Sequence, residues 1–231
     1  MAHQIGAAAL GLGFTLGLRH ALDADHIAAV STIVSESRSV WRSSLVGTSW
    51  GLGHTAALLA AGIAVIGLKL TIPPGLAHSM ETTVAIMLIL LGARAVHTAL
   101  RGWTIHQHAH SHDGSAHVHL HVHRSGRDEV HQHRHVLAFS ARPFLVGLVH
   151  GLAGSAGLMV LVLSTITSVL AGFAYIIVFG LGSTAGMLLM STLISVPFVS
   201  SVARRSWLVQ ALQLLVGCGS ILLGCVYGVA Q

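Results

Sequence analysis

Six long apolar segments, separated by short polar turns and one long polar loop, constrain the fold of this chain more than any other feature. They lie near residues 5–34, 44–69, 78–100, 143–168, 172–200 and 207–230. A helix needs roughly 20 residues to cross the hydrocarbon core of a bilayer, and each segment is long enough. Only 8% of the 231 residues are charged, whereas about 25% is usual in soluble domains. The sequence therefore predicts an all-α, polytopic membrane protein with six transmembrane helices.

The positions of the arginines predict the orientation of these helices. Arginines fall in the first, third and fifth loops, whereas the second loop offers only Lys69 and the fourth has no basic residue. Because basic loops stay on the cytoplasmic side, we expect a protein of the cytoplasmic (inner) membrane, with both termini outside and the long third loop inside. Nucleic acid is not an expected partner, since the basic residues form no extended face and no nucleic-acid motif occurs.

The two halves of the chain resemble each other. Residues 17–22 (GLRHAL) match residues 147–152 (GLVHGL), and shorter matches follow in order at nearly the same offset. Each half holds three expected helices, an odd number, so the halves must enter the membrane from opposite sides. Many secondary transporters are built from such inverted repeats. We expect a first repeat at 1–100, a histidine-rich loop at 101–141 and a second repeat at 142–231.

The first apolar segment contains a cluster of ionisable residues within the sequence RHALDADHI, residues 19–27. The cluster consists of His20, Asp23, Asp25 and His26. Ionisable groups are costly inside a bilayer and usually mark an ion or substrate pathway. Imidazole and carboxylate groups bind first-row transition cations. We therefore predict a metal site within the membrane.

The geometry of this cluster depends on whether the helix is continuous. On a regular helix, His20, Asp23 and His26 share one face and Asp25 points away from it. Asp25 is then a partner that orients an imidazole. Alternatively, the helix unwinds near Ala24 and brings both carboxylates inward, as in the broken helices of transporters. The sequence leaves both arrangements open.

Five further residues are candidates for metal binding. His54 lies in the second segment, just after Gly51 and Gly53, and is the expected ligand from a neighbouring helix. Glu81 and His78 lie near the outer end of the third segment, where they suit a metal-capture site, although Glu81 also has the simpler reading of a residue in the headgroup zone. His150, in the fourth segment, suits a supporting role, and His54 and His150 also have the simpler reading of interhelical hydrogen-bond partners. His3 completes an amino-terminal set of nitrogens that suits Ni²⁺ or Cu²⁺ if Met1 is kept.

The third loop is rich in histidine. Eleven of the eighteen histidines lie in it, namely His106, His108, His110, His112, His117, His119, His121, His123, His131, His133 and His135. Alternating histidine at this density is a metal-binding composition. We expect a flexible cytoplasmic reservoir that captures, buffers or senses metal. The alternative is a disordered linker whose histidines add positive charge below about pH 6.5.

The segment from Arg19 to Val30 resembles the nickel/cobalt permease family known as NiCoT, whose motif is a histidine, four residues and Asp-His. His20, Asp25 and His26 match this motif, and the Leu-Gly-His-Thr segment at His54 is similar to a second family motif, Leu-Gly-His-Ser. The resemblance implies a secondary transporter of Ni²⁺ or Co²⁺, with these four residues as functional positions and the metal as substrate.

The number of apolar segments refines this resemblance. Larger members of the family have eight spans, so the six segments here are closer to the small urease-associated nickel permeases. That resemblance implies cytoplasmic metallochaperones, such as those of urease or hydrogenase maturation, as partners.

The driving force favours uptake. No Walker A sequence occurs and Lys69 is the only lysine, so we expect no ATP binding through that loop. A dication gains roughly 4.6 kcal/mol from a membrane potential of about 100 mV, which corresponds to accumulation on the order of 10³-fold. We expect uptake of Ni²⁺ or Co²⁺ through a site near mid-membrane.

Other functions remain open at this point. A proton-coupled nickel/cobalt exporter is the first alternative, and a membrane metal sensor or accessory protein is the second. An enzyme is not expected, because di-iron membrane oxygenases need more histidine and carboxylate ligands converging from several helices.

Overall fold

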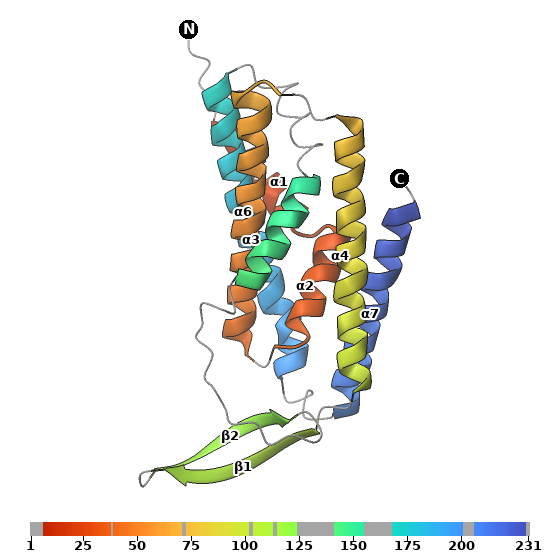
Figure 1. Ribbon diagram of the computed structural model, residues 1–231. Helices are drawn as coiled ribbons and strands as arrows, with labels where there is room; N and C mark the ends of the chain where they lie inside the picture. Colours follow the sequence, from red (N-terminus) through yellow and green to blue (C-terminus); the bar gives the residue numbers. More distant parts are fainter. Residues whose placement is uncertain are drawn as a thin grey trace.

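The computed structural model describes a helical bundle with a β-hairpin at one end (Figure 1). The described residues are 7–37, 39–70, 73–101, 104–112, 115–123, 141–154, 168–200 and 206–229. The first and last described helices, α1 and α7, point their free ends away from the hairpin (Figure 1).

The first expected span is not one helix but two short ones. Helix α1 is Ala7–His20 and α2 is Ala24–Val34. Between them, Asp23 has an extended backbone (φ −64°, ψ 147°) and stands at the N-cap of α2. The Asp23 side chain makes no capping hydrogen bond there, since its carboxylate lies on His20. A carboxylate in the first turn, here Asp25, is favoured by the helix dipole. Of the two arrangements that the sequence allowed, the structure therefore has the broken helix.

Four helices in the described part of the chain are long and apolar enough to span a bilayer. They are α3 (Val40–Gly62) continued by the π-helical η1 (Ile63–Gly67), α4 (Pro74–Leu100), α6 (Val169–Val199), and α7 (Ser206–Val229) from Trp207 onward. Of the remaining two expected spans, the first is broken, and the fourth is helical over 141–154 before passing into residues outside the described ranges. Six spans therefore stay a prediction.

Glycines let the helices pack closely. Helix α6 packs against both α1 and α3, and α4 packs against α7. A Cβ added at Gly17 would collide with the backbone carbonyl of Phe179 on α6, and one added at Gly147 with the backbone carbonyl of Trp50 on α3. Small residues at such crossings are typical of membrane helix bundles.

The histidine-rich loop, for which we expected no regular structure, contains a β-hairpin over residues 104–123 beside the α-helical bundle. Strands β1 (Thr104–His112) and β2 (Ser115–His123) are antiparallel, and their register places His108 opposite His119. Histidines alternate here with residues such as Val118 and Val122. This period of two is typical of a β-strand. The histidine content alone does not reveal it.

Candidate metal site

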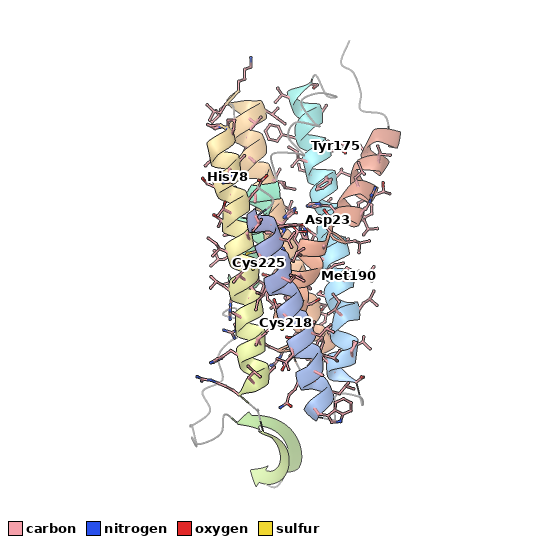
Figure 2. All side chains as sticks on the ribbon, turned by 90° about the vertical axis from the view of Figure 1, so that its right-hand side faces the viewer. Asp23, His78, Tyr175, Met190, Cys218 and Cys225 are labelled. Carbon is pink, nitrogen blue, oxygen red and sulfur yellow. The ribbon has the colours of Figure 1, made fainter. Side chains whose placement is uncertain are left out.

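Four histidines from four different segments meet inside the bundle. His20 ends α1, His26 lies in the first turn of α2, His54 lies on α3 and His150 on the helical segment 141–154. The ring centroid of His26 lies 4.6 Å from that of His20, 5.3 Å from that of His54 and 4.1 Å from that of His150. The break between α1 and α2 makes this convergence possible. Asp23, at the break, lies near the middle of the length of the bundle (Figure 2).

Two overlapping groups of these side chains have the geometry to hold a metal ion. Potential ligand atoms of His20, His26 and His54 all lie within 4.8 Å of one another, and so do those of Asp25, His26 and His150. His26, His54 and His150 are each at most 2% exposed. The expected ligands His20, Asp25, His26 and His54 are thus brought together.

Asp25 connects the two halves of the chain. Its Oδ1 lies 2.9 Å from the backbone N–H and 3.2 Å from Nδ1 of His26, and its Oδ2 lies 3.0 Å from Nε2 of His150. A carboxylate that holds one ring nitrogen of a histidine fixes its tautomer and leaves the other nitrogen free for a metal. Asp25 therefore both points inward, because the helix is broken, and orients imidazoles.

Asp23, unlike Asp25, lies outside both groups of potential ligands. Its Oδ2 lies 2.7 Å from Nδ1 of His20, and its side chain is 53% exposed. The structure thus places Asp23 as a partner that holds the His20 ring from the accessible side.

Several ring nitrogens in the cluster are buried without a hydrogen-bond partner in the described part of the chain. They are Nε2 of His26, both ring nitrogens of His54 and Nδ1 of His150. Most buried polar groups in proteins are paired, so each exception needs an explanation. A neutral imidazole nitrogen with a free lone pair is the atom that Ni²⁺ or Co²⁺ binds. The unpaired nitrogens and their convergence fit a transition-metal site.

The other candidates lie away from this cluster. His78 and Glu81 are exposed on α4, with His78 near the end of the bundle that is far from the hairpin (Figure 2). Neither belongs to a group of three potential ligands among the described residues. His3, His131, His133 and His135 lie outside the described residues, and the eight remaining loop histidines are those of β1 and β2.

His150 is more central than the sequence interpretation made it. It was expected at most to support the site, yet its ring is the nearest of the three to His26 and contacts Asp25. One sequence signal does identify it, because His150 stands where His20 stands in the matching hexapeptide of the first half.

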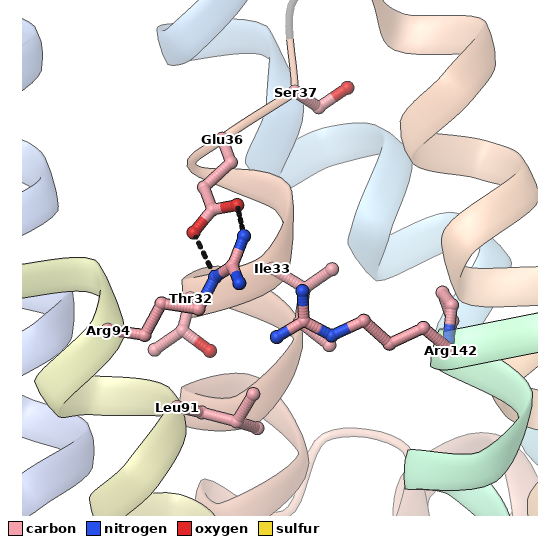
Figure 3. Close-up of a pocket in the computed structure, with 8 residues that line it drawn as sticks. Thr32, Ile33, Glu36, Ser37, Leu91, Arg94 and Arg142 are labelled. Carbon is pink, nitrogen blue, oxygen red and sulfur yellow. Dashed lines mark hydrogen bonds and ion pairs between the residues drawn. The ribbon is translucent and has the colours of Figure 1, made fainter. Parts of the chain in front are cut away.

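A cavity of about 320 Å³ lies at the other end of α2, beside α4 and the helical segment 141–154 (Figure 3). Nε and Nη2 of Arg94 donate to the two carboxylate oxygens of Glu36, each at 2.8 Å. Arg142 extends toward the cavity from the opposite side (Figure 3). Two guanidinium groups and one carboxylate repel a dication, so this cavity is a poorer metal site than the histidine cluster.

Comparison with known proteins gives a consistent result. A family model, NicO, high-affinity nickel-transport protein, matches residues 6–217. The urease accessory protein UreH of Bacillus sp. (strain TB-90) is 37% identical over 222 residues, which are 94% of this chain and 89% of that protein. The nickel transporter NicT of Mycobacterium tuberculosis (strain ATCC 25618 / H37Rv) is 37% identical over 78 residues, 31% of this chain and 21% of that protein.

A plant relative is more distant. The chloroplast protein FOR GROWTH AND FERTILITY 2 of Arabidopsis thaliana is 28% identical over 177 residues, which are 76% of this chain and 44% of that protein. No solved structure matches this chain.

Proposed function

Because this chain belongs to the NicO family of high-affinity nickel-transport proteins, we propose that it is a secondary transporter that carries Ni²⁺ into the cell across the cytoplasmic membrane. The family resemblance expected from the motif is confirmed, and so is the expectation that the chain is not an enzyme. It is a multi-pass membrane protein with four candidate spans in its described part. The observation that carries the proposal is the convergence of four histidines and Asp25 at the break between α1 and α2.

His20, His26 and His54 are the proposed ligands of the transported ion, and Asp25 orients His26. Three imidazoles suit Ni²⁺ and Co²⁺ alike, so the ligand types do not favour one metal over the other. An intramembrane site at the ends of two half-helices is the arrangement by which many secondary transporters bind their substrates. The near-absence of exposed surface at His26 and His54 keeps competing water away from the ion.

We infer that the two halves of the chain are inverted repeats of three helices each. Gly17 of the first half meets Phe179, and Gly147, its match in the second half, meets Trp50. A second pair of contacts shows the same exchange. Gly182 of the second half meets Phe14. Gly53, its match in the first half, meets Phe144, which is the match of Phe14. Equivalent contacts between exchanged halves are what a two-fold relation between the repeats requires.

We propose uptake driven by the membrane potential. A dication gains roughly 4.6 kcal/mol on moving inward across about 100 mV, without a second ion. The arginine positions favour a cytoplasmic location for the hairpin. A proton-coupled exporter remains the alternative within the carrier class, and a metal sensor or accessory protein is the alternative outside it.

The hairpin and the relatives suggest what happens to the ion inside the cell. The strand register places three pairs of histidine positions opposite each other, namely His106 and His121, His108 and His119, and His110 and His117. We propose that the hairpin buffers metal at the inner mouth. One relative is named a urease accessory protein, so we propose delivery of the nickel to urease maturation.

The direction of transport is tested by Ni²⁺ flux in proteoliposomes with imposed potentials. We expect Ni²⁺ to enter when the interior is negative, to leave preloaded vesicles when it is positive, and to do so without a pH gradient. Flux that requires a pH gradient, and ignores the sign of the potential, would favour the exporter. Metal binding without flux under any condition would favour a sensor.

A further inference from the structure

The two groups of potential ligands share one residue, His26, and differ in every other member. The first group adds His20 and His54 to it, and the second adds Asp25 and His150. Both groups are compact enough to hold an ion, but a single imidazole ring serves both. The question is whether the second group only supports the first or is itself a position for the ion.

The hydrogen bonds to Asp25 show which ring nitrogens of His26 and His150 have no partner. An ionised carboxylate only accepts hydrogen bonds, so Nδ1 of His26 and Nε2 of His150 both donate to Asp25. The lone pairs of the two neutral rings are then on Nε2 of His26 and Nδ1 of His150. Both atoms are buried and have no hydrogen-bond partner among the described residues. A residue that only oriented Asp25 would leave the second nitrogen of His150 without any role.

The shared residue makes the two positions mutually exclusive. A neutral imidazole has one lone pair, on Nε2 when Nδ1 carries the proton and on Nδ1 when Nε2 carries it. When Nδ1 of His26 donates to Asp25, Nε2 is free for an ion held with His20 and His54. When an ion lies among Asp25, Nδ1 of His26 and Nε2 of His150, it takes the place of both N–H donors to Asp25. The proton of His26 then moves to Nε2 and that of His150 to Nδ1. The cluster therefore holds one ion at a time.

Exposure differs between the two positions. The His20 side chain is 24% exposed and lies beside the exposed Asp23, whereas the His150 side chain is 3% exposed. His20 and His150 occupy matching places in the two halves. Of the two ligands that differ between the halves, His20 is thus the accessible one in this conformation and His150 the enclosed one, while Asp25 is 18% exposed.

We propose that the transported ion occupies the two positions in turn, first among His20, His26 and His54 and then among Asp25, His26 and His150, so that His150 is a direct ligand in the second half of the transport cycle. This inference rests on the proposed transport function. It makes His26 and Asp25 the constant part of the site, and it makes His20 and His150 the ligands that are exchanged.

The test compares Ni²⁺ binding and Ni²⁺ flux in the same variants. The parent is the full chain with His3, His78 and the eleven loop histidines replaced by asparagine, so that bound Ni²⁺ reports the buried cluster. In it, His150→Gln keeps an N–H near the position of Nε2 that can donate to Asp25 but removes the imidazole. The matched control is His97→Ala, since His97 is an exposed histidine of α4 outside the cluster. Folding is checked by the thermal unfolding midpoint.

We expect one Ni²⁺ per chain in the parent. His150→Gln should bind Ni²⁺ nearly as well as the parent but lose transport by about tenfold or more, the usual loss when one metal partner is removed. His20→Ala should lose binding and transport together. His97→Ala should change neither.

Three results would overturn the inference. Normal flux in His150→Gln would mean that His150 only positions Asp25. Equal loss of binding in His150→Gln and His20→Ala would mean a single site, and two Ni²⁺ per chain would mean that the positions are not exclusive. If the parent itself shows no flux, the proposed transport function fails first and the inference falls with it.

Discussion

Asp25 is the residue on which the geometry of the metal site depends most. Its two carboxylate oxygens hold His26 and His150, which come from different halves of the chain. Partners of this kind set the tautomer of a metal-binding histidine and its direction. The motif offered an orienting role for Asp25 as one of two options, but it did not reveal that His150 is one of the two imidazoles.

Replacing Asp25 tests the orienting role. In Asp25→Asn the side chain has one acceptor oxygen instead of two, so one of the two imidazoles loses its acceptor. We expect Ni²⁺ affinity to fall by roughly 10- to 100-fold, as for other partners of metal-bound histidines. Isothermal titration calorimetry on the chain with silenced loop histidines measures this loss. The control is Asp23→Asn, which should cost clearly less, because within the described ranges its carboxylate is hydrogen-bonded to one histidine, His20.

At the scale of the helices, close contacts between them fix the spacing of the residues of the metal site. The residues of the cluster lie on α1, α2, α3 and the segment 141–154, so their spacing depends on how closely these helices and α6 pack. Gly17 lies one turn before His20, directly against the backbone of Phe179. A side chain there must push α1 away from α6.

A matched pair of glycines on α1 tests this packing. Gly17→Ala should destabilise the protein by about 1–3 kcal/mol, the usual cost of overpacking, and should weaken Ni²⁺ binding by moving His20. Gly11→Ala is the control, since no atom of the described residues lies within 4 Å of a Cβ at that position. Thermal unfolding in detergent compares the two. Equal unfolding midpoints would show that the close approach of α1 to α6 is not needed.

The hairpin offers a second test at this scale, because the positions of its histidines can be changed while its amino-acid composition stays the same. Alternate residues of a strand lie on one face, and residues directly opposite have Cβ atoms about 4.5–5.5 Å apart. Exchanging Gln107 with His108 and His119 with Leu120 keeps the composition but moves one opposed pair to the other face. We expect Ni²⁺ binding by the hairpin to weaken on the order of tenfold, about 1.4 kcal/mol.

The control for this exchange swaps Ala109 and Ser111, which leaves every histidine in place. Calorimetry is done with His26→Ala as the common background, so that the buried cluster does not contribute. Unchanged binding after the histidine exchange would mean that the segment acts by composition alone, as a flexible reservoir would.

Much of the helical architecture could be predicted from the sequence, and the reason is the length of the apolar segments. The helices α3, α4, α6 and α7 lie where hydropathy placed them, within a few residues. The break at residues 21–23 could only be offered as one of two options, because two short helices and one long helix have the same hydropathy. The placement of His150 beside Asp25 depends on how distant segments pack, which no local pattern reports.

At the scale of the whole molecule, the orientation of the bundle decides which of its ends lies on which side of the membrane. The free ends of α1 and α7 lie at one end and the hairpin at the other (Figure 1). The turn between α2 and α3 belongs to the hairpin end, together with the cavity that contains the Glu36–Arg94 pair. From the positive-inside rule we propose that this end faces the cytoplasm.

Cysteine labelling tests the orientation. Cys218 and Cys225, both exposed on α7, are first replaced by serine. We expect Gly75→Cys, at the start of α4, to react with a membrane-impermeant maleimide in intact cells. Ser39→Cys, between α2 and α3, should react only after the cells are permeabilised. The reverse pattern would invert the topology and would contradict the proposal that the hairpin buffers metal at the inner mouth.

The central claim, that Ni²⁺ crosses the membrane through the buried histidine cluster, is tested most directly by Ni²⁺ flux into proteoliposomes under an inside-negative potential. The wild type is compared with His26→Ala, because His26 belongs to both groups of ligands, and with His97→Ala as control. We predict potential-dependent uptake by the wild type and the control and its loss, by at least tenfold, in His26→Ala. Undiminished uptake by His26→Ala would contradict the account.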